Sequence, residues 1–167
     1  MSSKSFSSSV IRGKDTYIFY NGRDTDDNPV IKYNRVRPDG RGSTSYLYVG
    51  DNTVPASDGP IAATNLFNGG LRLYVVSKRT IVEYGIDTPP GGEDEWKKEG
   101  FTSQPIQLAQ GSFLNALGAD EFSKYTAQDP KDPILLRIFY TSAKADDDVT
   151  QNTYTSKTGW VEKVIKS

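Results

Sequence analysis

The sequence predicts an all-β protein built from repeated strand pairs, and three observations support this. The 167 residues include 15 Gly, 9 Pro and 10 Tyr, which is typical of many short strands joined by turns. No long stretch shows the 3.6-residue period of an amphipathic helix, and the best candidate, residues 113–124, contains Gly118. A sequence pattern of two successive strands, which we call the phrase, recurs at a period of roughly fifty residues. Such a repeat indicates stacked supersecondary units within one domain, residues 1–167.

The first repeat, approximately residues 5–55, carries the phrase in altered form. We expect a remnant of a leading strand at 9–11 and the strand pair at 17–20 and 30–33. The turn-rich segments 24–29 and 38–44 are expected to be loops.

The second repeat, approximately residues 56–105, is the clearest copy. A leading strand is expected at 59–63, then the pair Leu-Arg-Leu-Tyr at 71–74 and Ile-Val-Glu at 81–83, and then Trp96. Alternation along a strand puts Arg72 on the face opposite to its two leucine neighbours.

The third repeat, approximately residues 106–167, follows the same plan. Its strands are expected at 111–114, 136–140 and 149–151, before Gly159 and Trp160. The spacing from Arg to Trp is 23 residues here and 24 in the second repeat, so the two copies place these side chains in similar positions.

An Arg and a Glu on paired strands indicate a polar binding site. Arg72 offers a planar fork of donors, and Glu83 offers only acceptors, so together they match a ligand rich in hydroxyl groups. A Trp adds an apolar face for the C–H groups of such a ligand. The alternative is a partly exposed salt bridge beside a core Trp. Because the Arg-to-Trp pattern recurs in a second repeat, we favour a binding site.

These phrases resemble the repeat of the fungal fucose-specific lectins of the Aleuria aurantia type and of their small bacterial relatives. That repeat has a leading strand, then a phrase like I-R-V-Y, then I-x-E, then Gly-Trp. The resemblance implies a six-bladed β-propeller with sugar sites between neighbouring blades. It also implies that one blade supplies Arg and Glu, and that the next blade supplies the aromatic residues.

Carried onto this chain, the resemblance implies one nearly complete site between the second and third repeats. Arg72 and Glu83 would bind sugar hydroxyls, and Tyr154 and Trp160 would form an aromatic wall. Two small apolar contacts complete the expected ligand-binding set: Ile134 and Leu136.

The other two sites depart from the pattern. In the first repeat, Tyr17 stands where Arg belongs and Lys32 where Glu belongs, with Trp96 facing them. These three residues are also the candidates for a catalytic site. The third repeat keeps Arg137 but has Gln151 in place of Glu, which predicts a second, weaker site completed by the first repeat of another chain.

Three blades cannot close a propeller, since closed rings have about four to eight blades. We therefore expect a homodimer in which two chains complete six blades. This arrangement would also cover sheet faces and strand edges that an open half-ring leaves exposed.

Composition excludes several functions. The net charge is −1 with interspersed signs, which does not favour nucleic acid or an anionic membrane as partner. The chain has no His and no Cys, so Ser-His-Asp and Cys-His catalysis are excluded, and we expect no metal site and no cofactor. The polar, Ser-rich segment 1–9 does not have the apolar core of a secretory signal, so we expect a cytoplasmic protein.

Two functions from different classes remain, besides a purely structural module. The first is a lectin that binds fucose or fucosylated glycans. The second is an enzyme on a lectin-like propeller, a cofactor-independent cyclase or isomerase of fungal secondary metabolism that guides cyclisation of a small apolar intermediate. Fold alone does not decide between them.

Overall fold

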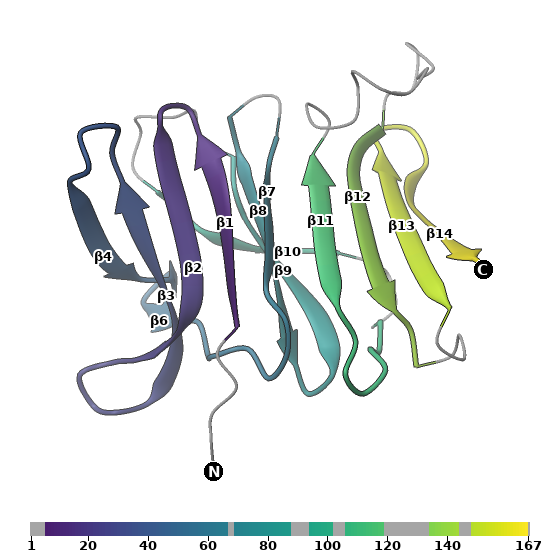
Figure 1. Cartoon of the computed structure of the whole chain (residues 1–167), viewed down its shortest axis with the longest axis horizontal. Coiled ribbons are helices and arrows are strands. Elements are labelled where there is room, and N and C mark those ends of the chain that lie inside the picture. Colours follow the sequence, from purple (N-terminus) through teal and green to yellow (C-terminus); the bar gives the residue numbers. More distant parts are fainter. Residues whose placement is uncertain are drawn as a thin grey trace.

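Antiparallel β-structure accounts for the fold of this chain (Figure 1). The computed structural model describes residues 6–66, 69–87, 94–101, 106–118, 134–143 and 148–166. Within these ranges there is no helix, and three four-stranded sheets and one small hairpin are present. No helix in the described ranges has the length and hydropathy needed to span a membrane.

Each sheet is formed by four strands that are consecutive in the chain, which we call blades 1, 2 and 3. Blade 1 contains β1 (Ser7–Arg12), β2 (Asp15–Arg23), β3 (Pro29–Val36) and β4 (Gly42–Tyr46). Blade 2 contains β7 (Ala62–Asn65), β8 (Leu71–Ser77), β9 (Thr80–Ile86) and β10 (Lys97–Glu99). Blade 3 contains β11 (Leu114–Gly118), β12 (Ile134–Thr141), β13 (Val149–Thr155) and β14 (Gly159–Ile165). The hairpin is β5 (Tyr48–Val49) with β6 (Asn52–Thr53).

The blades stand side by side, with the first strand of each blade innermost. β7 contacts both β1 and β11, and Figure 1 shows blade 1 in purple and blade 3 in green and yellow on either side of blade 2. Two apolar clusters fill the two interfaces. Alternation along β8 serves both of them, because Leu71 and Leu73 belong to the cluster toward blade 1 and Tyr74 and Val76 to the cluster toward blade 3.

The two outer faces of this row of blades carry exposed apolar side chains. Val161 and Ile165 lie opposite Thr153 and Val149, on the face of blade 3 that points away from blade 2, and they are 52% and 41% exposed. Ile11 on blade 1 is 62% exposed. The described chain therefore leaves apolar side chains uncovered on both of its outer sheet faces.

Two local expectations from the sequence change in the structure. The helical candidate 113–124 contains strand β11 up to Gly118, and its remainder lies outside the described residues. β4 begins at Gly42, inside the segment 38–44 that we expected to be a loop, because this segment pairs with the end of β3. Blades 1, 2 and 3 fall within residues 5–55, 56–105 and 106–167 respectively.

Candidate functional site

A cavity of about 280 Å³ lies in the cleft between blades 2 and 3. It is lined by residues from both blades and from the segments beside them: Leu66, Arg72, Glu83, Glu99, Gly100, Leu135, Leu136, Tyr154 and Trp160. Five of the six residues expected to bind a ligand thus surround one cavity. Ile134 begins β12, and its side chain lies outside the described part of the structure.

Arg72 lies across the face of blade 2 with its guanidinium held by several acceptors. Its Nη2 donates to Asp87 at 2.8 Å, its Nη1 donates to the Leu71 carbonyl at 3.0 Å, and its Nε lies 3.5 Å from Glu83 Oε1. Gly85 makes this position possible, because a Cβ there would come within 2.6 Å of Arg72 Nη1. The guanidinium is therefore fixed before any ligand arrives, which reduces the entropic cost of binding.

Glu83 is the most buried charged group of the cavity, at 4% exposed. Its Oε1 accepts a hydrogen bond of 2.9 Å from the buried hydroxyl of Tyr74, and its Oε2 has no hydrogen bond among the described residues. Burial raises the pKa of Glu83 to about 7, although Tyr74 and Arg72 lower it, and the charges of Glu99 and Asp87 add to the rise. The carboxyl group thus changes its charge near neutral pH.

An aromatic wall closes the cavity on the side of blade 3. Tyr154 and Trp160 lie opposite each other on β13 and β14, with ring centroids 5.3 Å apart. Phe101 packs edge-on against Trp160 at 4.7 Å, and Tyr74 packs against Phe101 at 5.6 Å. The wall is held in place from behind, so it presents a fixed apolar face next to the polar groups of blade 2.

Sequence reasoning missed two charged side chains beside this cavity, Glu99 and Asp87. No sequence motif marks Glu99. It reaches the cavity because β10 pairs with β9, which places Glu99 directly opposite Glu83. Asp87 follows β9 directly and reaches back to Arg72.

The cleft between blades 1 and 2 is filled by aromatic side chains. Tyr17, Phe19, Tyr33 and Trp96 are all 8% exposed or less and belong to one cluster. Trp96 packs edge-on against Phe19 at 5.5 Å, and Tyr17 stacks on Tyr33 at 5.8 Å. In the cleft between blades 2 and 3, the equivalent space holds Arg72 and the cavity.

Lys32 does not share this cleft with Tyr17 and Trp96, contrary to our expectation. Phe19 pairs with Tyr33 and Tyr20 with Lys32, so Lys32 projects from the opposite face of blade 1, where its Nζ lies over the Tyr46 ring. Matching the phrases by sequence put Lys32 at the position of Glu83. The strand register shifts this match by one residue and puts Tyr33 there, because Tyr74 pairs with Glu83 as Phe19 pairs with Tyr33.

Arg137 and Gln151 of the second expected site lie on the outer face of blade 3. Arg137 pairs with Thr153, and Gln151 Nε2 donates to Thr153 Oγ1 at 2.7 Å. By register they correspond to Arg72 and Glu83. A cleft there would need a further blade, which the described residues of one chain do not provide.

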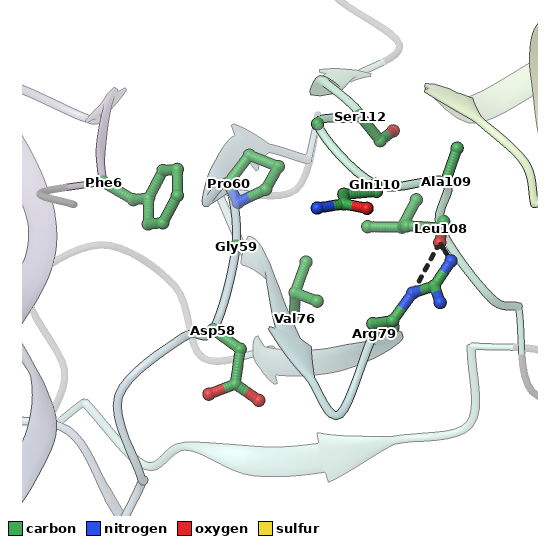
Figure 2. Close-up of a pocket in the computed structure, with 11 residues that line it drawn as sticks. Phe6, Asp58, Gly59, Pro60, Val76, Arg79, Leu108, Ala109, Gln110 and Ser112 are labelled. Carbon is green, nitrogen blue, oxygen red and sulfur yellow. Dashed lines mark hydrogen bonds between the residues drawn. The ribbon is translucent and has the colours of Figure 1, made fainter. Parts of the chain in front are cut away.

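A second cavity, of about 510 Å³, lies where the segments leading into the inner strands meet (Figure 2). Phe6, Pro60, Val76 and Leu108 give it apolar walls. Its two charged side chains hold backbone groups, since Arg79 donates to the Leu108 carbonyl at 3.0 and 3.2 Å and Asp58 accepts from the Lys78 amide at 2.7 Å. None of the residues expected to bind a ligand lines it.

Comparison with known proteins identifies the fold. The sequence matches no protein-family model and no curated protein. The structure is similar to AofleA from Arthrobotrys oligospora (14% identity, TM-score 0.64, covering 96% of this chain and 43% of that one). It is also similar to Aleuria aurantia lectin, described as a six-bladed β-propeller with a novel fucose recognition mode (16% identity, TM-score 0.59, covering 98% and 49%). A third similar structure is a fucose lectin from Kordia zhangzhouensis in complex with methyl-fucoside (12% identity, TM-score 0.54, covering 96% and 99%).

These matches show the fold, a β-propeller like that of Aleuria aurantia lectin, and the described residues of this chain form three blades. The chain spans less than half the length of the first two proteins and nearly the whole length of the third. The all-β propeller expected from the sequence is thereby confirmed, and its completion by a second chain stays a prediction.

Proposed function

We propose that this protein is a lectin that binds a saccharide in the cleft between blades 2 and 3. The observation that supports it is that Arg72, Glu83, Tyr154 and Trp160 line one cavity, although they come from positions 72 to 160 of the chain. A sugar presents hydroxyls that both donate and accept, together with an apolar ring face. A fixed guanidinium, a carboxylate with a free oxygen and an aromatic wall match all three features.

Fucose, free or at the end of a glycan, is the saccharide we propose. Leu66, Leu135 and Leu136 add an aliphatic patch to the cavity, and such a patch suits the methyl group of a 6-deoxy sugar. Two of the similar structures are described by fucose recognition or a fucoside complex, which supports the same choice.

Calorimetric titration with methyl α-L-fucoside tests the proposal. Replacing Arg72 with Ala removes a charged hydrogen-bond donor worth roughly 1.5–3 kcal/mol, so binding should weaken by about ten- to a hundredfold. Arg41→Ala is the matched control, because that side chain is 82% exposed and pairs only with Asp39 on the surface. Equal affinities of Arg72→Ala and the unaltered protein would refute the assignment.

We further propose that two chains assemble into a six-bladed ring, with blade 3 of each chain against blade 1 of the other. The exposed apolar residues Val161, Ile165 and Ile11 on the two outer faces support it, since a closed ring would bury them. Val161→Asp should give a monomer in light scattering. Val164→Asp is the control, since Val164 lies on the same strand but on its other face, and that variant should remain a dimer.

The contacts between the two chains would not create an equivalent sugar site. By register, the positions of Tyr154 and Trp160 correspond in blade 1 to Val36 and Gly42. A cleft between Arg137 and the partner would therefore lack an aromatic wall. We expect one saccharide per chain, which the stoichiometry of the same titration measures.

No geometric observation favours the cyclase. Of its candidate residues, Lys32 lies on the face of blade 1 opposite to Tyr17 and Trp96, and Tyr17 and Trp96 are 1% and 4% exposed. A small apolar intermediate could reach them only if the aromatic cluster opened.

A further inference from the structure

The cavity between blades 2 and 3 contains more negative than positive charge. Among the described residues, one guanidinium, that of Arg72, and two carboxylates, those of Glu83 and Glu99, line the cavity, and a third carboxylate, Asp87, lies beside it at 55% exposed. Asp87 is satisfied by its hydrogen bond with Arg72, and Glu83 is shared between Arg72 and Tyr74. A neutral sugar would leave this surplus uncompensated.

Among the described residues that line the cavity, Glu99 is the carboxylate that pairs with no cation. It lines the cavity, yet it forms no hydrogen bond or ion pair with any residue in the described chain. Its Cγ lies 3.1 Å from the place that a Cβ on Gly85 would occupy, so the side chain lies beside the Arg72 guanidinium rather than out in solvent. Lys97 lies on the same face of β10 but is exposed and does not line the cavity.

Strand pairing forces Glu99 and Glu83 together. They are directly opposite each other on β10 and β9, and like charges in that position repel. This repulsion contributes to the raised pKa of Glu83, after burial as the larger cause. A cation placed between the two carboxylates would relieve it, and the faces of Tyr154 and Trp160 also attract cations.

We infer that the preferred ligand is a saccharide carrying a protonated amine, and that Glu99 is the residue that selects it. The inference rests on the proposed sugar-binding function and specifies its ligand class. The amine would replace one hydroxyl of the sugar and lie within reach of Glu99, while Arg72 and Glu83 hold the neighbouring hydroxyls. A sugar with a carboxylate at that position would be rejected by the same charges.

Calorimetric titrations of the full-length chain near neutral pH test the inference. The probes are methyl α-L-fucoside, a set of its analogues in which an amine replaces each hydroxyl in turn, and its C6-carboxylate analogue. We expect at least one amine analogue to bind about tenfold more tightly than the neutral parent, and the carboxylate analogue to bind more weakly than that parent.

Glu99→Gln keeps the shape of the side chain and removes its charge. It should abolish the preference for the amine, so that the affinities for the amine analogue and for the neutral fucoside become equal within about threefold. Lys97→Gln, on the same strand but outside the cavity, should change neither. Equal binding of neutral and amine sugars by the unaltered protein would overturn the inference, and so would an amine preference that survives Glu99→Gln. Either result would leave the proposed lectin function standing. Absence of binding to every sugar would overturn both.

Discussion

Glu83 should make the folded protein less stable as pH rises, in contrast to most carboxylates. Its pKa is about 7 in the folded state against 4.5 for an unperturbed glutamate, so the folded state keeps a proton that the unfolded chain has already lost. The contribution of Glu83 to stability is therefore fully present at or below about pH 4.5 and is lost as pH rises, until the folded group ionises near pH 7. The difference of the two pKa values corresponds to about 3 kcal/mol at 1.36 kcal/mol per unit.

Glu83→Gln removes this titration and keeps a side chain that can accept from Tyr74. Urea unfolding at fixed protein concentration, at about pH 5 and pH 8, measures the effect. The unaltered protein should lose about 2–3 kcal/mol more than the variant between these two conditions. Glu95→Gln, at an exposed position, should behave like the unaltered protein. Parallel pH dependence of the Glu83 variant and the unaltered protein would refute the burial argument.

Further changes test neighbouring contacts. Glu99→Gln should move the midpoint of this pH dependence to lower pH in the same assay, because Glu99 raises the pKa of Glu83; an unchanged midpoint would contradict their proximity. Gly85→Ala should weaken fucoside binding in calorimetry by about tenfold or more, since its Cβ would displace the Arg72 guanidinium; unchanged affinity would show that the guanidinium does not hold the ligand. Arg12→Ala should cost roughly 3–5 kcal/mol of unfolding free energy, because Asp94 would lose its buried partner, whereas Arg23→Ala at an exposed pair should cost under about 1 kcal/mol. A small loss in the first variant would mean that water replaces the guanidinium.

Binding should also depend on pH. A sugar hydroxyl that donates to Glu83 needs the ionised carboxylate, so the affinity of the neutral fucoside should rise between about pH 6 and pH 8 and then level off. Calorimetry across this range measures it, and a pH-independent affinity would show that Glu83 does not accept from the ligand.

The sequence by itself determined the repeated strand pairs and the faces on which their side chains lie within blades 2 and 3. Alternation in Leu71-Arg72-Leu73 was enough to separate the apolar face from the polar one, because side chains in a strand have a period of two. Near-equal spacing from Arg72 to Trp96 and from Arg137 to Trp160 was enough to align two blades. Local pattern carries this information without any knowledge of long-range contacts.

Only the tertiary structure decided what fills each cleft. Lys32 and Tyr33 are adjacent in sequence, and the register of β2 with β3, set by pairing over the whole hairpin, determines which of them faces blade 2. Glu99 joins the cavity because β10 pairs with β9 across a long connection, and no local pattern marks that pairing. The charge of the site, and the pKa of Glu83 with it, arises from groups that meet only when the blades are packed together, so it could not be read from the chain alone.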